Sequence, residues 1–507
     1  MNFRQIQAIL HRWFGIMVLW VIFFIFLTGS IAYFRTEINV WAQPEALSQI
    51  QSLPTPQTSA QTAFNYLNQH AADAKRWRVT VASERMPVNL LQWQDQTGKH
   101  QQLQNPVTGE LLNPVRQTLA GDFFFKLHYT LYPLPSKIGS FIVAIVALIL
   151  LISLITGVIT HKKIIKEFFV FRAFKGQRSL LDLHHITGVI TFPFYLVMAF
   201  TGLLILFYLV LPWGLSKHYA QDGIPQFYNE MQFVKMAKPQ PSSSQHNMPP
   251  FERFIQQLPA QAQTGATLDK FEVQKPNTPE AMITFDYNYK NIITLNTPQY
   301  IFAAHTAEPL AQPRNLSAIA QLASSSYGIH LGYFASYWMR LILSVMGIMG
   351  CVMLAAGALL WQKKRMKEVH AFSYKLVQHL NFFTFLGLPL ACVSYLLAGR
   401  LLPAAFEPRG RYEVSAFYLT WLLSLLISLL LRTRTAMLLV LATTATVLFL
   451  IPLSSFVMVP EAALWQSLSH SRWSLAGVDL VLLVMGGLYL GAIHIYLSRF
   501  KPAGAST

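Results

Sequence analysis

The sequence predicts an all-α polytopic membrane protein with about eight transmembrane helices and two small α+β domains outside the membrane. Three observations lead to this fold class. Of the 507 residues, 53% are apolar and only 12% are charged, which is too apolar for an ordinary soluble protein. Several apolar stretches reach the roughly 20 residues that a helix needs to cross about 30 Å of hydrocarbon. Two long polar segments, 35–127 and 212–330, interrupt the series.

The predicted spans follow the apolar stretches of the chain. They lie near 12–34, 138–160, 185–211, 338–361, 380–402, 415–431, 436–456 and 474–497. The first stretch is too long for the apolar core of a signal peptide and lacks a small-x-small cleavage site, so we expect an uncleaved anchor. The last four stretches are joined by short connections, and we interpret them as an appended four-helix membrane module.

The polar segments carry mixed helix and strand patterns. Residues 58–72 have the spacing of an amphipathic helix, whereas 78–82, 90–94 and 281–287 alternate as short strands. Each segment is therefore predicted to form a small domain of its own. The resulting division is 1–34 for the first helix, 35–135 for the first external domain, 136–211 for the second and third helices with a basic loop, 212–335 for the second external domain, 336–365 for the fourth helix and 366–507 for the C-terminal module.

The charge distribution predicts the orientation in the membrane. The formal net charge is +17, but the long polar segments are close to charge balance. The excess lies in short connections that contain Lys162, Lys163 and Lys166, then Lys363 and Lys364, then Arg432 and Arg434. Short basic connections stay in the cytoplasm. We therefore expect a multi-pass protein of the bacterial cytoplasmic (inner) membrane, with both termini cytoplasmic, both external domains periplasmic and no nucleic-acid partner.

An internal repeat relates the first and third spans. His11, Gly15, Thr28 and Gly29 align without a gap with His184, Gly188, Thr201 and Gly202. The second and fourth spans match in a similar way, since a histidine among aromatic residues precedes each span and a glycine lies near its inner end. Both halves run in the same direction, which predicts a parallel tandem repeat of helices 1–2 and 3–4 about an axis along the membrane normal.

The repeat arranges four of the fifteen histidines in two pairs at different depths. His11 and His184 are predicted at the inner ends of the first and third helices. His128 and His330 are predicted at the outer ends of the second and fourth helices, most of a bilayer away. Two imidazoles at one depth on facing helices can ligate an iron porphyrin from both sides. Because the chain has no CxxCH attachment site, we expect two non-covalent haem b groups whose iron these histidines bind.

Other interpretations of the histidines stay open. A single histidine at a membrane boundary is more often a polar interface residue than a ligand. His161 and His185 compete with His11 and His184 for the inner site. The counterpart of His161 in the repeat is a tryptophan, and His185 points about 100° away from His184 on a helix, so both are alternates. Asp182 is expected either to orient an imidazole or to cap the third helix.

Motifs for other kinds of chemistry are missing from the sequence. It contains no G-x-G-x-x-G after a strand, no Walker A motif, no H-E-x-x-H and no G-x-S-x-G. Cys351 and Cys392 both fall in predicted spans and form no CxxC pair. An electron donor is therefore expected outside this chain, either a quinol or a cytosolic reductase. We assign no acid–base catalytic residue.

The chain resembles the PepSY-associated transmembrane family. The resemblance lies in His11-Arg-Trp-x-Gly with Thr28-Gly29, in Asp182-x-His184 with Gly188, and in the turn over 105–112, and it covers about 8–365. The family includes iron-regulated inner-membrane proteins and periplasmic ferric-siderophore reductases with two b-type haems. The resemblance implies PepSY-like external domains and electron delivery to ferric iron. Members usually end after four helices, so the C-terminal module is a departure from the family pattern.

These observations together predict a membrane-bound ferric-siderophore reductase. Electrons would cross the lipid bilayer through the two haems to a ferric siderophore or another ferric chelate in the periplasm, and reduction would release the iron. The alternative is a haem-free PepSY-domain protein that binds or regulates a partner outside the membrane, or a transporter component.

Overall fold

The computed structural model describes residues 1–48, 50, 52–112, 115–161, 170–210, 212–219, 223–231, 247–259, 262, 266–289, 293–295, 299–311 and 316–499. Lys162, Lys163 and Lys166 of the predicted basic connection lie outside the described residues. The chain forms two compact units. The membrane unit comprises Met1–Ala42, Arg116–Leu206 and Ser336–Thr507, and the sheet unit comprises Gln43–Val115 and Phe207–Ala335.

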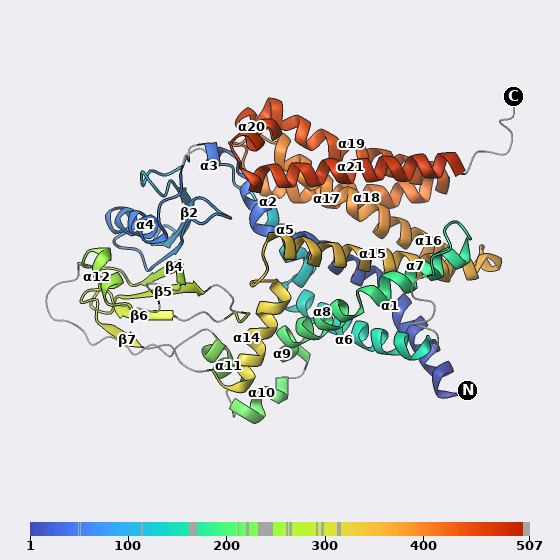
Figure 1. Cartoon of the computed structure of the whole chain (residues 1–507), viewed down its shortest axis with the longest axis horizontal. Coiled ribbons are helices and arrows are strands. Elements are labelled where there is room, and N and C mark those ends of the chain that lie inside the picture. Colours follow the sequence, from blue (N-terminus) through green and yellow to red (C-terminus); the bar gives the residue numbers. More distant parts are fainter. Residues whose placement is uncertain are drawn as a thin grey trace. The chain divides into compact units, whose positions relative to one another are not determined.

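The membrane unit is built from helices alone among the described residues (Figure 1). Its elements are α1 (Phe3–Ala32), α2 (Arg35–Ala42), α5 (Ala120–Thr130), α6 (Ser136–Thr160), α7 (Gln177–Ile190), α8 (Phe192–Ile205), α15 (Tyr337–Lys364), η2 (Met366–Glu368), α16 (Phe372–Phe382), the π-helix η3 (Phe383–Gly387), α17 (Leu388–Leu401), α18 (Arg409–Leu430), α19 (Thr433–Met458), η4 (Pro460–Ala462), α20 (Leu464–Ser469) and α21 (Trp473–Arg499). In the described chain, 7 helical segments are long and apolar enough to cross a membrane, or up to 8 with the bent pair α7–α8. The prediction of a polytopic membrane protein is confirmed.

The third predicted span differs from its expected form. It is not one helix near 185–211 but the two helices α7 and α8, which are bent by 65° at Thr191. Pro193 stands in the first turn of α8, where it cannot donate a backbone hydrogen bond to α7 and its ring crowds the preceding turn. The Thr191 hydroxyl also donates to the Thr187 carbonyl. Pro193 was a visible signal for this break.

The helices of the membrane unit pack as a bundle around α1 with the C-terminal helices beside it. α1 packs against α5, α6 and α15, while α7 packs against α15. The π-helix η3 also reaches α1. There the Trp421 indole N–H donates to the Phe383 carbonyl at 2.9 Å, and the two rings stack at 4.5 Å. Phe24 of α1 lies on the same indole at 5.6 Å, so aromatic packing joins α1 to α18.

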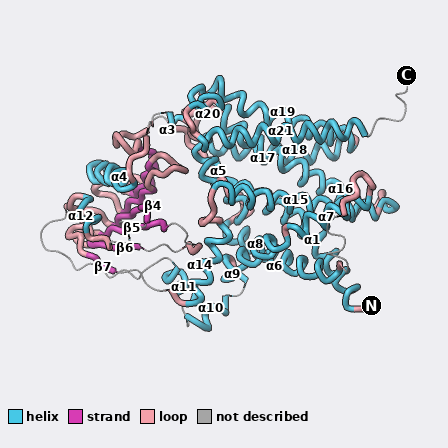
Figure 2. The backbone as a smooth tube through the Cα atoms, in the orientation of Figure 1, coloured by secondary structure: helices cyan, strands magenta, loops and turns pink. Residues whose placement is uncertain are grey.

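In the part of the chain that the structure describes, the sheet unit has an antiparallel sheet of 7 strands in the order β3-β2-β1-β4-β5-β6-β7 (Figure 2). Its strands are β1 (Arg76–Thr80), β2 (Asn89–Gln94), β3 (Lys99–Gln104), β4 (Ala266–Gln274), β5 (Met282–Tyr289), β6 (Gln299–Ala303) and β7 (Pro309–Ala311). Its helices are α3 (Glu45–Ser48), α4 (Pro56–His70), α9 (Phe207–Val210), α10 (Pro212–Tyr219), α11 (Gly223–Met231), α12 (Phe251–Gln256) and α14 (Ala318–Leu331).

The two polar segments, which the sequence analysis treats as two external domains, contribute strands to the same sheet. β1 to β3 come from the first polar segment and β4 to β7 from the second, yet β1 pairs with β4 from Arg76↔Gln274 to Thr80↔Lys270. Two separate sheets would each leave an unpaired strand edge at this point, and pairing β1 with β4 satisfies both edges. The two polar segments therefore fold as one unit.

One face of the sheet forms the hydrophobic core of this unit. Trp77 and Val79 of β1 lie in register with Val273 and Phe271 of β4, and all four side chains are buried. α4 and α12 cover this face with further aromatic rings, among them Phe64, which lies edge-on to Trp77 with ring centroids 6.0 Å apart. Both polar segments supply buried residues to this core, so neither segment alone would form it.

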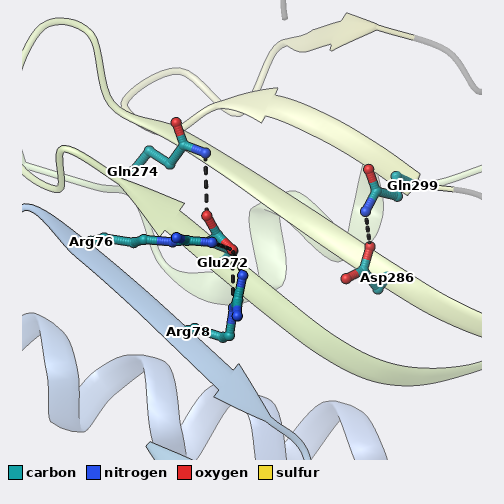
Figure 3. A network of polar contacts seen from close by, with 6 residues as sticks. All are labelled: Arg76, Arg78, Glu272, Gln274, Asp286 and Gln299. Atoms are coloured by element: carbon teal, nitrogen blue, oxygen red, sulfur yellow. Dashed lines mark hydrogen bonds and ion pairs between the residues drawn. The ribbon is translucent and has the colours of Figure 1, made fainter. Parts of the chain in front are cut away.

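The opposite face carries a polar network (Figure 3). Glu272 of β4 accepts hydrogen bonds from Arg76 at 2.5 Å and from Arg78 at 3.2 Å, both on β1. Further along the sheet, the Gln299 amide donates to Asp286 of β5. These cross-strand contacts link β1 to β4 and β5 to β6 on the side away from the aromatic core.

Asp286 is expected to make the stability of the sheet unit depend on pH. Burial raises the pKa of this carboxyl above its ordinary value, although the hydrogen bond from Gln299 opposes the shift. Above about pH 3.9 the unfolded chain releases this proton, whereas the folded unit still holds it. The contribution of Asp286 to the free energy of unfolding is therefore complete below that pH and is lost as the pH rises through the folded pKa. We expect Asp286→Asn, which keeps no ionisable proton, to slow proteolysis of this unit at about pH 7 but not at about pH 3.

The control for this experiment is Asp73→Asn, because Asp73 is exposed in the turn between α4 and β1 of the same unit. The measurement is the rate at which proteases cleave the sheet unit in the whole, detergent-solubilised chain, compared with wild type at each pH. An equal gain for Asp286→Asn at both pH values would contradict the argument.

Candidate cofactor site

Two of the predicted ligand histidines face each other in the membrane unit. His11 lies on α1 and His184 on α7, and their ring centroids are 6.2 Å apart with an interplanar angle of 67°. Both side chains are partly buried. Residues that are far apart in the sequence thus form a pair of imidazoles inside an apolar bundle.

Each imidazole of this pair is anchored by a backbone carbonyl on a neighbouring helix. His11 Nδ1 lies 2.9 Å from the Ser153 carbonyl oxygen of α6, and His184 Nδ1 lies 2.8 Å from the Met353 carbonyl oxygen of α15. A carbonyl can only accept, so Nδ1 must carry the proton in both rings. Nε2 is then the nitrogen with a lone pair for a metal. A hydrogen bond of this kind fixes the tautomer and orientation of metal-binding histidines.

A glycine lies beside each anchored ring. Gly157 and Gly357 follow the two acceptor residues by one helical turn on α6 and α15. A Cβ at Gly157 would lie 3.1 Å from His11 Cε1, and a Cβ at Gly357 would lie 3.0 Å from His184 Nδ1. Any other residue would press on the imidazole, so glycine permits the ring to approach the helix closely enough to reach the carbonyl. The two histidines therefore have equivalent local environments.

His128 has the same kind of environment at another level of α1. It lies on α5, its Nδ1 is 2.9 Å from the Ile25 carbonyl oxygen, and a Cβ at Gly29 would lie 2.7 Å from the ring. Again the acceptor carbonyl and the glycine are one turn apart on one helix. His330 lies on α14 in the sheet unit. The pairing of His128 with His330 stays a prediction, as does the tandem repeat of the two halves.

The pair formed by His11 and His184 fits the demands of a haem with two axial imidazoles. A metal–imidazole bond is about 2 Å long and the ring centroid lies roughly 1 Å behind the nitrogen, so opposed ligands place their centroids roughly 6 Å apart. The observed 6.2 Å agrees with this separation. The described residues contain no group of three or more His, Cys, Asp or Glu that could bind a metal ion.

A comparison with protein families supports the resemblance seen in the sequence. The model of the PepSY-associated TM region matches residues 8–364. The chain belongs to this family. The PepSY-associated region runs from α1 to the end of α15 and includes His11, His128, His184 and His330. A search of curated proteins found no match. The helices from α16 to α21 lie beyond the PepSY-associated region.

The alternate histidines of the PepSY-associated region form a contact of their own. The rings of His161 and His185 are 3.9 Å apart at an interplanar angle of 77°. This separation is too short for a metal between opposed imidazoles, which requires roughly 6 Å. The geometry thus favours His11 and His184 over the alternates as an axial pair.

Asp182 has neither of the two roles expected for it. Its carboxylate accepts hydrogen bonds from the Arg172 backbone N–H at 2.9 Å, from Nε at 2.8 Å and from Nη2 at 2.7 Å. Gly176, not Asp182, precedes the first residue of α7. The carboxylate therefore fixes the chain that enters α7, the helix that carries His184, and it does so through an arginine in the basic loop.

Sequence reasoning missed the acceptor carbonyls of Ser153, Met353 and Ile25, because a backbone acceptor leaves no mark on residue type. The glycine that follows each acceptor by one turn is the signal that could have located it. Gly15 differs from these glycines, since a Cβ there would have no neighbour within 4 Å among the described residues.

Proposed function

We propose that this protein transfers electrons across the bacterial cytoplasmic membrane through two b-type haems and reduces ferric chelates, such as ferric siderophores, on the periplasmic side. The observation that carries the proposal is the pair of His11 and His184, with each Nδ1 bound to a backbone carbonyl and the ring centroids 6.2 Å apart. Haem supplies reversible one-electron chemistry when it is bound between two such imidazoles.

The residues of the chain hold the two cofactors at different levels. His11 and His184 are the ligands of the inner haem. His128 and its sequence partner His330 are the ligands of the outer haem. His128 contacts α1 at Ile25, which lies about 21 Å along the helix axis from His11. Two sites at this separation support a path that crosses most of the apolar layer, since the hydrocarbon is about 30 Å thick.

The class of substrate is inferred from the chemistry of iron release, and the class of electron donor from the motifs that the sequence lacks. Hard oxygen ligands hold Fe(II) less tightly than Fe(III), so one-electron reduction of a ferric siderophore releases its iron. No nicotinamide or flavin motif occurs in the sequence. A quinol or a cytosolic reductase is therefore the electron donor at the inner haem. No side chain has to act as a general acid or base in this reaction.

An optical spectrum of the purified protein tests the proposal. We expect dithionite to produce the sharp α-band of six-coordinate b-type haem, with about two haems per chain. The reduced protein should be reoxidised when a ferric siderophore is added, and Fe(II) should appear in step with the loss of the α-band. Absence of an α-band after haem supplementation would overturn the proposal and favour a haem-free PepSY-domain binding or regulatory protein, or a transporter component.

A further inference from the structure

The helix that carries His128 is held on one side by α2. Asn39 of α2 accepts a hydrogen bond from the Gly121 backbone N–H at 2.7 Å and donates to the Asp122 carboxylate at 3.1 Å. A Cβ at Gly121 would lie 2.3 Å from the Arg35 carbonyl oxygen, so only glycine fits there. The beginning of α5 is thus pressed closely against α2.

The other side of α5 is held by two helices beyond the family match. Tyr395 of α17 stacks on Phe123 with ring centroids 4.3 Å apart and donates its hydroxyl to the Ala120 carbonyl at 3.4 Å. Phe417 of α18 meets the same phenylalanine edge-on at 5.1 Å. The side chains of Phe123, Phe417 and Tyr395 are almost completely buried. Aromatic packing of this kind fixes orientation as well as burying area.

A partly buried chain of hydrogen bonds leads from α18 to the first residue of α5. Glu413 accepts from Arg409 Nη1 at 2.8 Å, and these two side chains are 1% and 0% exposed. The other Glu413 oxygen accepts from the Thr118 hydroxyl at 2.6 Å. The Thr118 oxygen in turn accepts from the Ala120 backbone N–H at 3.1 Å. A buried ion pair is weak evidence for stability, and its best-attested use is to specify one arrangement of the elements it joins.

We propose that α17 and α18 position the outer haem ligand. Tyr395 and the Thr118–Glu413 hydrogen bond fix the start of α5, and the rigid helix carries this constraint to His128, about 12 Å further along its axis. These are positioning residues because they act through α5 and touch no cofactor. The inference rests on the proposed function, since it takes His128 as a haem ligand. It gives a structural role to α17 and α18, which lie beyond the PepSY-associated region.

The test compares Thr118→Val, which has nearly the same shape but no hydroxyl, with Thr118→Ser, which keeps it. Both are made in the full-length chain and in its His184→Ala variant, where only the outer haem is expected. We expect Thr118→Val to weaken binding of the outer haem by up to about 10-fold, the lower end of the effect of losing a group bonded directly to a metal ligand, because Thr118 acts through α5. The midpoint potential of this haem should shift, and Thr118→Ser should restore it.

The inner haem serves as the internal control. In the chain with both haems, Thr118→Val should leave the occupancy and potential of the inner haem unchanged. A parallel loss of both haems would indicate general misfolding and overturn the inference, as would a Thr118→Val protein with an unaltered outer haem. Tyr395→Phe keeps the stacking and loses only the hydroxyl, and it should cause a smaller shift of the same sign. A wild-type protein without haem overturns the proposed function as well, so the two failures are distinct.

Discussion

His184→Ala is expected to remove one of two b-type haems and to leave the other in place. The His184 imidazole is the partner of His11 across 6.2 Å, and its Nδ1 is bound to Met353, so no other nitrogen of α7 occupies this position. A haem held by both imidazoles would keep only one protein ligand in this variant, and the sequence has no CxxCH motif to attach it covalently. The measurement is the pyridine haemochrome content per chain, which should fall from about two to about one.

The neighbouring histidine provides the matched control for this experiment. His185 follows His184 directly, but its ring lies 3.9 Å from the ring of His161. His185→Ala removes the same number of atoms from the same turn of α7 and should keep both haems. His11→Ala should reproduce the loss seen with His184→Ala, and the double variant should lose no further haem. Retention of both haems in His184→Ala with a loss in His161→Ala would overturn the assignment of the inner site.

The sequence carried enough information to locate most of the spans and to align the two histidines that the structure brings together. Spacing alone aligned His11 with His184, because each is followed by glycine after one turn and by Thr-Gly near the other end of the helix. Periodicity cannot, however, show which carbonyl an imidazole reaches, since this depends on how α6 and α15 pack. The contact between His161 and His185 could not be predicted for the same reason. Neither residue shows in its local sequence where the other helix lies.

The sheet unit illustrates a second limit of sequence reasoning. Alternation identified short strands, but the pairing of Arg76 with Gln274 joins residues that lie in different polar segments. An edge strand looks the same in sequence whether its partner is nearby or on the far side of two membrane spans. The bend at Thr191 is different, because Pro193 gave a local reason to expect it. A local residue marks the bend, whereas no local residue marks which distant strand pairs with β1.

Gly357→Ala is expected to lower the affinity for the inner haem, although alanine has a higher helix propensity than glycine and favours α15. The added Cβ would lie 3.0 Å from His184 Nδ1 and 3.1 Å from Cε1, so the ring has to move away from α15 and its hydrogen bond to Met353 lengthens. Loss of such an orienting contact costs about 10–100-fold in affinity for the metal group. Alanine in place of glycine nevertheless stabilises a helix interior by about 1 kcal/mol. A fall in haem affinity without a fall in thermal stability is therefore the expected result.

Two further glycine variants sharpen this prediction. Gly157→Ala should have the same effect, because a Cβ there would lie 3.1 Å from His11 Cε1. Gly491→Ala in α21 is the control, since a Cβ at that position would have no neighbour within 4 Å and the helix propensity gain is the same. Haem affinity is measured by titrating haem into the haem-free protein. If Gly357→Ala bound haem as tightly as Gly491→Ala, the close approach of α15 to His184 would have no part in holding the cofactor, and the anchoring carbonyl would lose its proposed role.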